Sequence, residues 1–455
     1  MPLRDAIVLA AGGGARMWPF ATVRNKCAMP VGNVPNVRRL ADALARAGVQ
    51  RVAVVVGARA DSVRRALLAS APEVRFVEQP AGGGTAGAVL AGMRALDAER
   101  FLVLYGDTVV SEADLRAVIA AAGENSCAAL VTPMPSGEGW AWYGARVQGD
   151  SVIGVVGHDA EATERLCGVL ALDRSYAVHL EASPGYMACV PVGGMPPLEP
   201  DLFQAINDRG APLAAVWCSQ PVVDMDKPWH VLQANALAAQ WECAALVESR
   251  IDPSARVHDG AEIDGAVALG PGSVIGNRVV VRGPLIAGAH TRIVNGAILE
   301  GGNLVGDRCR ISDYCLLGSD TVVGHGCIVG HGAEMDGVLF DGAYLWHYCE
   351  ISGVVGASVD IGAATVCGTL RFDDGHAEHR VAGRRERPRD GANATYIGDY
   401  SRTGVNAVTM PGAKIGSYAC VGAGVIVYED VPDRTLTLLK QETIRRPWGP
   451  ERYGW

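Results

Sequence analysis

The sequence of 455 residues contains little lysine and few aromatic residues, and it has no long uninterrupted hydrophobic run. Lys accounts for only four of the 40 basic residues, and the formal net charge is −9. A chain of this charge lacks the basic surface that binds nucleic acid. Because no apolar stretch approaches the roughly 18–20 residues needed to span a bilayer, we expect no membrane association either.

Cysteine is present, but not in a pattern that indicates a disulfide scaffold or a zinc site. Twelve Cys in 455 residues is a low density, and no two of them form a C-x-x-C pair. Residues 6–11 form an apolar strand soon after the start of the chain, without the basic segment of a signal peptide. We therefore expect a reduced, cytoplasmic protein.

The first half of the chain alternates strand-like and helix-like patterns. Apolar runs that each end at a Gly cover residues 6–11, 52–56 and 101–105. Their alternation with amphipathic segments predicts an α/β domain over residues 1–228, with a mostly parallel sheet covered by helices on both faces. An Ala- and Leu-rich stretch without Gly or Pro predicts a linker helix over residues 229–248.

From residue 251 onward the hydrophobic period changes to six. The first run of hexads consists of Ile251, Val257, Ile263, Leu269, Ile275 and Val281. We expect the register to slip near Pro284, before hexads resume at Val305. Sustained hexads are typical of a left-handed parallel β-helix, in which three hexads form one triangular coil. This domain is predicted over residues 249–431, with a C-terminal tail over residues 432–455.

Two features of the hexad region need separate interpretation. An Arg-rich insertion at residues 370–395 contains His376 and His379, and we expect it to project from the coil as a solvated loop or as a binding arm. Three cysteines also lie at multiples of six residues, namely Cys309, Cys315 and Cys327. Their spacing places them in the narrow interior of the coil, so we expect stacked core thiols rather than metal ligands.

A glycine-rich segment near the N-terminus indicates a phosphate-binding site. Residues 12–14 are three consecutive Gly, which let backbone N–H groups approach an anion closely. Arg16 and Lys26 follow, and two cations beside such a turn suit a polyphosphate. The segment lacks the Lys-Ser/Thr of a P-loop and a clear acidic partner of the dinucleotide-binding type.

The same region resembles the signature of sugar-1-phosphate nucleotidyltransferases. The resemblance rests on residues 9–16 and 25–32, and then on Gln79 with residues 84–86, residues 104–107 and residues 223–229, in the family's order. A hexapeptide-repeat domain follows in the bifunctional uridylyltransferase/acetyltransferases that make UDP-N-acetylglucosamine. The late coils at residues 403–406, 410–412 and 414–416 and the tail at residues 438–442 resemble those of the archaeal type of these proteins. The resemblance implies a Rossmann-like nucleotidyltransferase domain followed by a left-handed β-helix that commonly forms homotrimers.

The resemblance also implies a reaction and a set of site residues. A nucleoside triphosphate, UTP or dTTP, would react with a sugar-like phosphate and release pyrophosphate, with Mg²⁺ as the cofactor. The implied catalytic cations are Arg16 and Lys26. The implied nucleotide-binding residues are Leu9, Ala11, Gly12, Gly14, Gln79, Gly84, Thr85 and Gly106. The implied substrate-binding residues are Tyr143, Gly144, Gly185 and Lys227. The implied metal ligands are Asp107 with Asp224 or Asp226.

The chain departs from this family in both halves. The Glu-Lys pair expected after residue 156 is absent, so we expect an atypical acceptor. In the second half, Trp346 stands where the catalytic His belongs, and His347 is the candidate base for acyl transfer.

Three functions therefore stay open for the protein as a whole. The favoured one is a nucleotidyltransferase whose β-helix mainly trimerises the chain. The second is a bifunctional enzyme that also acetylates an amino-sugar phosphate with acetyl-CoA. The third is a non-catalytic regulatory or scaffold subunit, against which the retention of Arg16, Lys26 and Asp107 argues.

Overall fold

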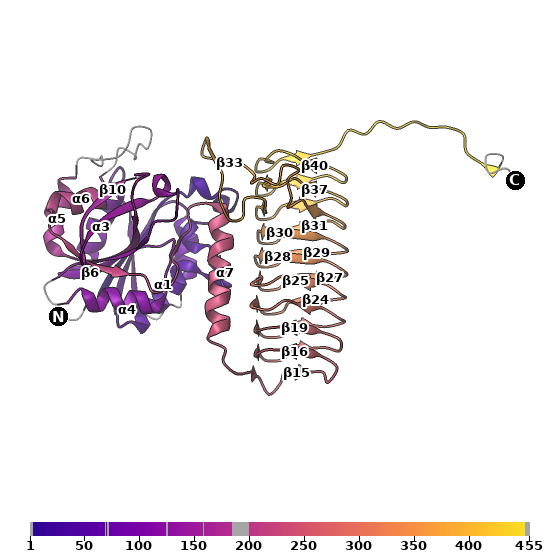
Figure 1. The fold of residues 1–455 in the computed structure, drawn as a ribbon, viewed down its shortest axis with the longest axis horizontal. Helices are drawn as coiled ribbons and strands as arrows, with labels where there is room; N and C mark the ends of the chain where they lie inside the picture. Colours follow the sequence, from indigo (N-terminus) through magenta and orange to yellow (C-terminus); the bar gives the residue numbers. More distant parts are fainter. Residues whose placement is uncertain are drawn as a thin grey trace.

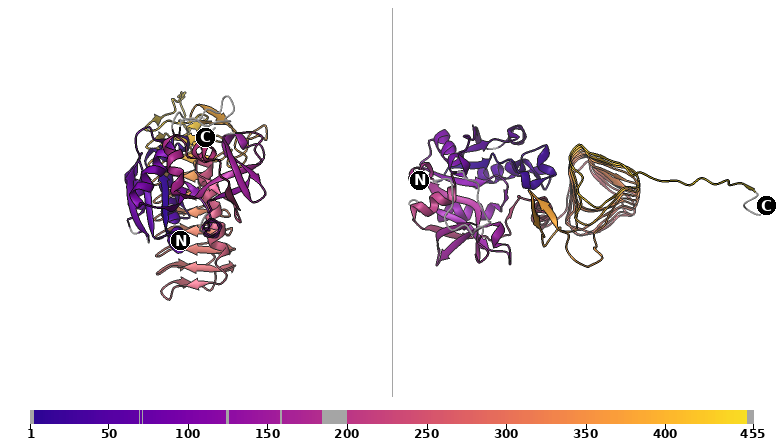
Figure 2. Two further views of the ribbon diagram at one scale, coloured as in Figure 1. Left: turned by 90° about the vertical axis from the view of Figure 1, so that its left-hand side faces the viewer. Right: turned by 90° about the horizontal axis from the view of Figure 1, so that it is seen from above.

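The computed structural model contains an N-terminal α/β domain, a long helix and a C-terminal parallel β-helix (Figures 1 and 2). It describes residues 3–68, 70, 72–123, 126–157, 159–183 and 200–450. Within these ranges, no helix combines the length and the apolar character that a membrane crossing requires. The fold class predicted from the sequence is confirmed.

A nine-stranded sheet forms the centre of the N-terminal domain, with the order β5-β4-β1-β6-β11-β8-β12-β10-β9. Its strands are β1 (Asp5–Ala10), β4 (Arg51–Val56), β5 (Glu73–Glu78), β6 (Arg100–Tyr105), β8 (Ala128–Pro133), β9 (Tyr143–Gln148), β10 (Ser151–Gly157), β11 (Glu164–Asp173) and β12 (Leu213–Trp217). The neighbours β5, β4, β1 and β6 pair in parallel. The near-continuous apolar sequences of β1, β4 and β6 follow from burial on both faces of the sheet, whereas β5 lies at its edge and carries exposed charged residues.

Helices cover both faces of this sheet. The helices are α1 (Asn36–Arg46), α2 (Ala60–Ala66), α3 (Gly84–Leu96), α4 (Glu112–Ala121), α5 (Ala177–Glu181) and α6 (Leu202–Arg209). One core cluster joins α1, α2 and α4 to residues such as Val8 of β1, and a second joins α3, α5 and α6 to residues such as Ile7. Successive residues of a strand thus point to opposite faces, as the period of two requires.

The connecting helix α7 (Pro228–Ala244) lies between the two domains (Figure 1). It begins with Pro at its first position, which suits a helix start, and it ends before the predicted limit at residue 248. Buried residues such as Trp229 and Ala238 share one core cluster with Phe20 of the first domain and Tyr396 of the second. The helix therefore packs against both domains over its length.

The β-helix stacks short parallel strands on the faces of a triangular coil (Figure 2). Ten strands form one sheet: β15 (Arg256–Val257), β18 (Val274–Ile275), β21 (Arg292–Ile293), β24 (Arg310–Ser312), β27 (Ile328–Gly330), β29 (Tyr344–Trp346), β31 (Asp360–Ile361), β36 (Arg402–Thr403), β39 (Cys420–Val421) and β41 (Leu436–Thr437). The other faces form a sixteen-stranded sheet that starts at β14 (Arg250–Ile251) and includes β17 (Val267–Leu269), β20 (Leu285–Ala287), β23 (Asn303–Val305), β26 (Val322–Val323), β28 (Glu334–Leu339) and β30 (Glu350–Val355).

The predicted slip of register near Pro284 is wrong. Leu269 pairs with Ala287, and Ala287 pairs with Val305, so the hexads continue through this region. The small side chain of Ala287 is buried in the coil and was not recognised as a core position. The register shifts later, where Val323 pairs with Leu339.

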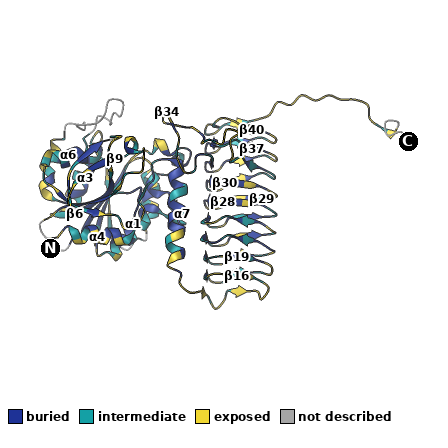
Figure 3. Cartoon of the chain, viewed as in Figure 1, coloured by how far each residue is buried: buried dark blue, intermediate teal, exposed yellow. Residues whose placement is uncertain are grey.

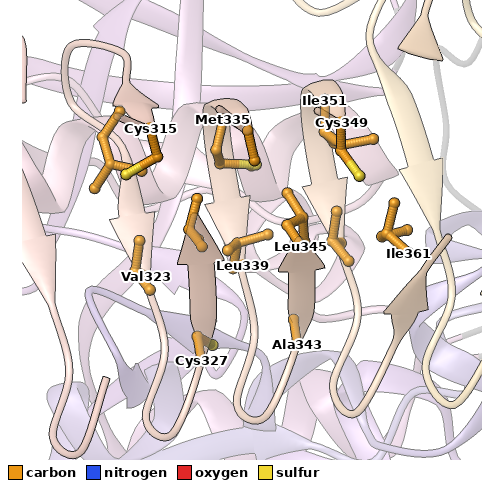
Figure 4. Packing of buried hydrophobic residues seen from close by; sticks show 14 of the residues in the cluster. Cys315, Val323, Cys327, Met335, Leu339, Ala343, Leu345, Cys349, Ile351 and Ile361 are labelled. Carbon is orange, nitrogen blue, oxygen red and sulfur yellow. The ribbon is translucent and has the colours of Figure 1, made fainter. Parts of the chain in front are cut away.

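The coil interior and its ends also differ from a uniform hexad pattern. Ile251 is 46% exposed although it starts the first run, because no coil lies beneath it (Figure 3). At the other end, Leu436 pairs with Cys420, so the last coil extends beyond the predicted limit at residue 431. Cys309, Cys315 and Cys327 are all buried in the coil, so their predicted place in its interior is confirmed. Figure 4 shows Cys315 and Cys327 among the packed side chains. The cysteines within the described ranges are free.

The Arg-rich insertion leaves the coil as predicted, but it is not a solvated loop: it forms a hairpin of β33 (His379–Val381) and β34 (Arg384–Glu386), in which His379 and Glu386 are buried. The hairpin lies beside the start of α7 (Figure 1). Glu386 binds Lys227 at 2.6 Å, and the His379 ring lies 5.1 Å from the ring of Trp229. The insertion is therefore a contact between the two domains.

Candidate functional site

The candidate site lies where β1 and β6 end side by side. Leu9 pairs with Tyr105, and the backbone N–H of Gly106 donates to the carbonyl of Leu9 at 2.9 Å. The Gly-rich segment after β1 therefore lies beside Asp107, which follows β6. Carboxyl ends of adjacent parallel strands are where open α/β sheets bind ligands.

Backbone geometry and one buried amide shape the Gly-rich segment. Gly14 has a φ of +66°, in the left-handed region that favours glycine. Asn25 is buried, and its side-chain N–H groups donate to the carbonyls of Ala10, Gly12 and Ala58 at 3.0, 3.2 and 2.8 Å. Asn25 thus holds the Gly-rich segment against the end of β1. The sequence motif did not indicate this role.

Each of the three acidic residues contacts a cation. Lys26 forms an ion pair with Asp107, and its ammonium lies 4.0 Å from Asp226. Arg16 binds Asp226 at 2.8 Å. Asp224 pairs with Arg165 and accepts a hydrogen bond from the hydroxyl of Thr108.

Burial and charge act together on the central pair. Burial alone would lower the pKa of Lys26, but the carboxylates of Asp107 and Asp226 raise it above its usual value. Burial raises the pKa of Asp107, Lys26 lowers it, and the charge of Asp224 raises it further. Lys26 therefore stays protonated at neutral pH, and burial beside a second carboxylate makes the charged form of Asp107 less favourable than that of a free carboxylate.

A neutral histidine orients the second acidic block. His230 is buried at the start of α7, and burial, with the charges of Lys227 and Arg165, lowers its pKa well below the usual value. Its Nδ1 accepts a hydrogen bond from the backbone N–H of Asp226 at 3.1 Å. His230 thus holds Asp226 in place without adding a positive charge.

The residues predicted to meet the nucleotide lie around the same strand ends. Gln79 follows β5 and donates from its side-chain amide to the carbonyl of Gly84 at 3.1 Å. Thr85 lies in the first turn of α3, where its hydroxyl donates to Asp201 at 3.2 Å. Ala11 and Gly12 follow β1 directly. Their contacts with a nucleotide remain predictions.

The residues predicted to bind the acceptor differ in their burial and in their contacts. Tyr143 lies at the start of β9, with its ring 4.5 Å from that of Phe203. Gly144 is buried, and a Cβ there would lie 2.7 Å from that of Ala162. Lys227 is 5% exposed, and its partner is Glu386 of the inserted hairpin. Gly185 lies outside the described residues.

Arg165 of β11 is a site residue that the sequence did not reveal. Its guanidinium lies 3.9 Å from the ring centre of Trp142 and pairs with Asp224, and its Nε is buried without a hydrogen-bond partner among the described residues. Burial would lower the pKa of Arg165, but Asp224 raises it. The residue lies outside every recognised motif, so only the fold brings it to the acidic block.

The carboxylates fit the coordination preferences of Mg²⁺. Within the described ranges, no group of three or more His, Cys, Asp or Glu side chains is arranged to hold a metal alone. Mg²⁺ usually takes one or two carboxylates and completes its shell with water and substrate phosphates. Asp107 and Asp224 are linked through the pairing of β7 (Thr108–Val109) with β13 (Val223–Asp224), so they can supply such a partial set.

Comparison with known proteins agrees with this geometry. Residues 6–220 match the family of MobA-like NTP transferase domains. A bifunctional protein GlmU from Alkalilimnicola ehrlichii is 30% identical, and the alignment covers 95% of this chain and 93% of that protein. The chain belongs to the GlmU-like family of sugar-phosphate nucleotidyltransferases. The resemblance predicted from the motifs is thereby confirmed.

A second relative also aligns over nearly the whole chain, and a solved structure aligns over about half of it. A bifunctional sugar-1-phosphate nucleotidylyltransferase/acetyltransferase from Sulfurisphaera tokodaii is 24% identical over 94% of this chain and 98% of its own. A solved structure of UDP-glucose pyrophosphorylase with UDP-glucose aligns with 53% of this chain at 15% identity and a TM-score of 0.46. As a GlmU-like nucleotidyltransferase, the protein is an enzyme, contrary to the non-catalytic alternative.

In the β-helix of this GlmU-like chain, His347 lies in an exposed cluster of rings. Its backbone is in the left-handed region at the corner after β29, and its Nδ1 lies 3.0 Å from Nδ1 of His331. The hydroxyl of Tyr348 lies 3.3 Å from Nε2 of His331. The part of His347 in acyl transfer remains a prediction.

Proposed function

We propose that this enzyme joins a nucleoside monophosphate, from UTP or dTTP, to an atypical sugar-like phosphate and releases pyrophosphate. The observation that supports the proposal is the convergence of Arg16 and Lys26 with Asp107 and Asp226. The reaction needs no protein nucleophile, because an acceptor phosphate oxygen attacks the α-phosphorus directly. Catalysis then consists of positioning the reactants and offsetting charge.

The two cations of the Gly-rich segment would bind the triphosphate. Arg16 is half exposed and can exchange Asp226 for phosphate oxygens, whereas the Lys26 side chain is only 19% exposed and stays charged at neutral pH because its pKa is raised. Both charges would stabilise the pyrophosphate as it leaves. Backbone N–H groups of the segment at residues 11–14 would add contacts to the phosphates.

We propose Asp107 and Asp224 as the carboxylates that hold Mg²⁺. Asp224 pairs with Thr108, the residue after Asp107, and its charge raises the pKa of Asp107, so a cation between the two carboxylates would relieve their repulsion. Bound there, Mg²⁺ would neutralise charge on the reacting phosphates. Asp226 instead contacts Arg16 and approaches Lys26, and would orient these two cations.

We propose that Arg165 takes the acceptor phosphate. The family's Glu-Lys pair is missing, and Arg165 brings a guanidinium to the acidic block from a different strand. Its planar fork matches two phosphate oxygens, and the face of Trp142 holds it flat. Arg165 places its positive charge on a different strand from the family's Glu-Lys pair, and aromatic residues lie near it. Both differences support an acceptor other than plain N-acetylglucosamine-1-phosphate.

The quaternary structure and location belong to the same proposal. A homotrimer is supported by exposed aromatic residues on the coil, including Tyr314, Tyr348 and Tyr428. Closed symmetric assemblies bury such surfaces. The free thiols are in keeping with a reducing compartment such as the cytoplasm.

Acyl transfer from acetyl-CoA is a second candidate function. The observation that favours it is the contact of His347 with His331, because a neighbouring ring can orient an imidazole that acts as a base. Consumption of acetyl-CoA in the presence of an amino-sugar phosphate, lost in His347→Ala, would support it.

A substrate panel tests the main proposal. The full chain is incubated with Mg²⁺, with UTP or dTTP, and with a series of sugar phosphates, and pyrophosphate release is measured. We expect turnover with one triphosphate and with a modified sugar phosphate. A preference for plain N-acetylglucosamine-1-phosphate would contradict the proposed acceptor class.

A further inference from the structure

The chain between the two catalytic cations packs on the β-helix. The indole N–H of Trp18 donates to Asp433 at 3.0 Å, and the hydroxyl of Thr22 donates to the same carboxylate at 2.9 Å. The carbonyl of Pro19 accepts from the hydroxyl of Ser417 at 3.1 Å. The segment that joins Arg16 to Lys26 is therefore held by another domain.

A buried ion pair and an aromatic contact complete this attachment. Arg24 pairs with Asp399, whose side chain is fully buried, and its guanidinium lies 5.1 Å from the ring centre of Phe340. The ring of Phe20 lies edge-on to those of Phe340 and Tyr396, at 5.7 and 6.4 Å. A buried, hydrogen-bonded charge pair strongly disfavours alternative positions of the segment.

Asp399 and Asp433 also form hydrogen bonds within the β-helix, and this role can be distinguished from their contact with residues 16–26. One corner of the coil carries Asp307, Asp341, Asp399 and Asp433, and each accepts a backbone N–H bond from the preceding coil. These bonds are 2.7–2.8 Å long and are equivalent in all four. Only the last two also contact residues 16–26 within the described part of the chain. Their second contact is thus additional to coil stability.

We propose that Asp399 and Asp433 are positioning residues for nucleotidyl transfer. They hold the segment between Arg16 and Lys26, and so fix where both cations meet the triphosphate. The proposal rests on the proposed function of this site. Loose cations would lose the advantage of fixed geometry, since misplacement by about 1 Å can lower a rate 100-fold.

The first test measures the attachment itself. Amide hydrogen exchange is followed at residues 16–26 in the full chain, in Asp433→Ala and in the control Asp341→Ala. We expect exchange in this segment to rise about tenfold in Asp433→Ala and to stay unchanged in Asp341→Ala, because only the first variant frees the segment. Equal exchange in all three proteins would overturn the proposal.

The second test separates positioning from general stability. We expect Asp433→Ala to lower kcat/KM for the triphosphate about tenfold and to leave KM for the acceptor phosphate unchanged. Asp433→Asn, which keeps one acceptor oxygen, should recover part of the loss. Losses equal to those of Asp341→Ala would contradict a positioning role.

A variant of the segment keeps the test valid if Asp433→Ala does not fold. Thr22→Val removes one hydrogen bond to Asp433 and leaves the β-helix unchanged. It should raise exchange at residues 16–26 and lower kcat/KM for the triphosphate in the same direction. A wild-type chain that releases no pyrophosphate would contradict the proposed function, and the exchange result would then still decide whether the aspartates hold the segment.

Discussion

Breaking the ion pair between Lys227 and Glu386 should destabilise the contact between the domains. The two side chains lie 2.6 Å apart, and the residues are only 5% and 7% exposed. The Lys227 ammonium also lies 5.3 Å from the ring centre of Trp140 and 5.7 Å from that of Trp229. Neither charge could recover full hydration if its partner were removed.

The magnitude follows from this burial. Removing one partner of a buried pair leaves an uncompensated charge and destabilises by about 3–5 kcal/mol, whereas replacing both by apolar residues is often nearly neutral. We therefore expect Lys227→Met and Glu386→Gln each to lower the free energy of unfolding by about 3 kcal/mol. The double variant Lys227→Met/Glu386→Leu should lose about 1 kcal/mol or less.

Urea unfolding followed by tryptophan fluorescence measures this cycle, because Trp140 and Trp229 flank the pair. Additive losses in the double variant would refute the reasoning, since coupling is the signature of a shared contact. The same variants test the predicted role of Lys227 in substrate binding. If Lys227 bound the substrate phosphate, Lys227→Met would raise KM for the acceptor without loss of stability.

Three further predictions concern other parts of the chain. Arg165→Met should raise KM for the acceptor phosphate at least tenfold and leave KM for the triphosphate unchanged, as steady-state kinetics would show; equal effects on both would contradict the assignment. Gly106→Ala should destabilise the fold by about 1–3 kcal/mol in denaturant titrations, because overpacking forces neighbours to shift. A Cβ there would lie 2.9 Å from Sγ of Cys27 and 3.0 Å from the carbonyl oxygen of Leu9. Unchanged stability would contradict this prediction, because it would show that Cys27 and Leu9 can move to make room for the methyl group. Burial and the Lys414 ammonium lower the pKa of His379 from 6.5 to about 4, so the unfolded chain binds more protons between these pH values. The free energy of unfolding is therefore unaffected by His379 above pH 6.5 and decreases as the pH falls towards 4, by at most about 1.4 kcal/mol per pH unit. The variant His379→Gln should show a smaller decrease over this pH range.

Periodicity carried most of the fold prediction. Hexads of aliphatic residues require a coil, and alternating strand and helix patterns require a layered sheet, so both domains follow from local sequence. The supposed slip near Pro284 shows the limit of this reasoning, because Ala287 fills a core position with a side chain too small to mark it. Ile251 follows the hexad pattern but is exposed, because it lies at the end of the stack and no neighbouring coil covers it.

The site divides in the same way between local and long-range information. The motifs selected Arg16, Lys26 and Asp107, and the structure places these residues close together because strand ends and tight turns position them; their roles remain predictions. Arg165 contacts the acidic block from a distant strand, and Asp433 contacts the segment after Arg16 from another domain. The spacing of residues along the sequence therefore does not predict either contact. Long-range ion pairs of this kind appear only when the packing of the two domains is known.

Pyrophosphate release by the full chain and by Asp107→Asn is the most direct test of the central claim. The substitution keeps the size of a buried side chain and removes the charge that pairs with Lys26. We expect the wild-type enzyme to release pyrophosphate only when Mg²⁺, a triphosphate and an acceptor phosphate are all present, and the variant to be slower by roughly 100-fold or more. Turnover by Asp107→Asn at the wild-type rate would contradict the account of the site.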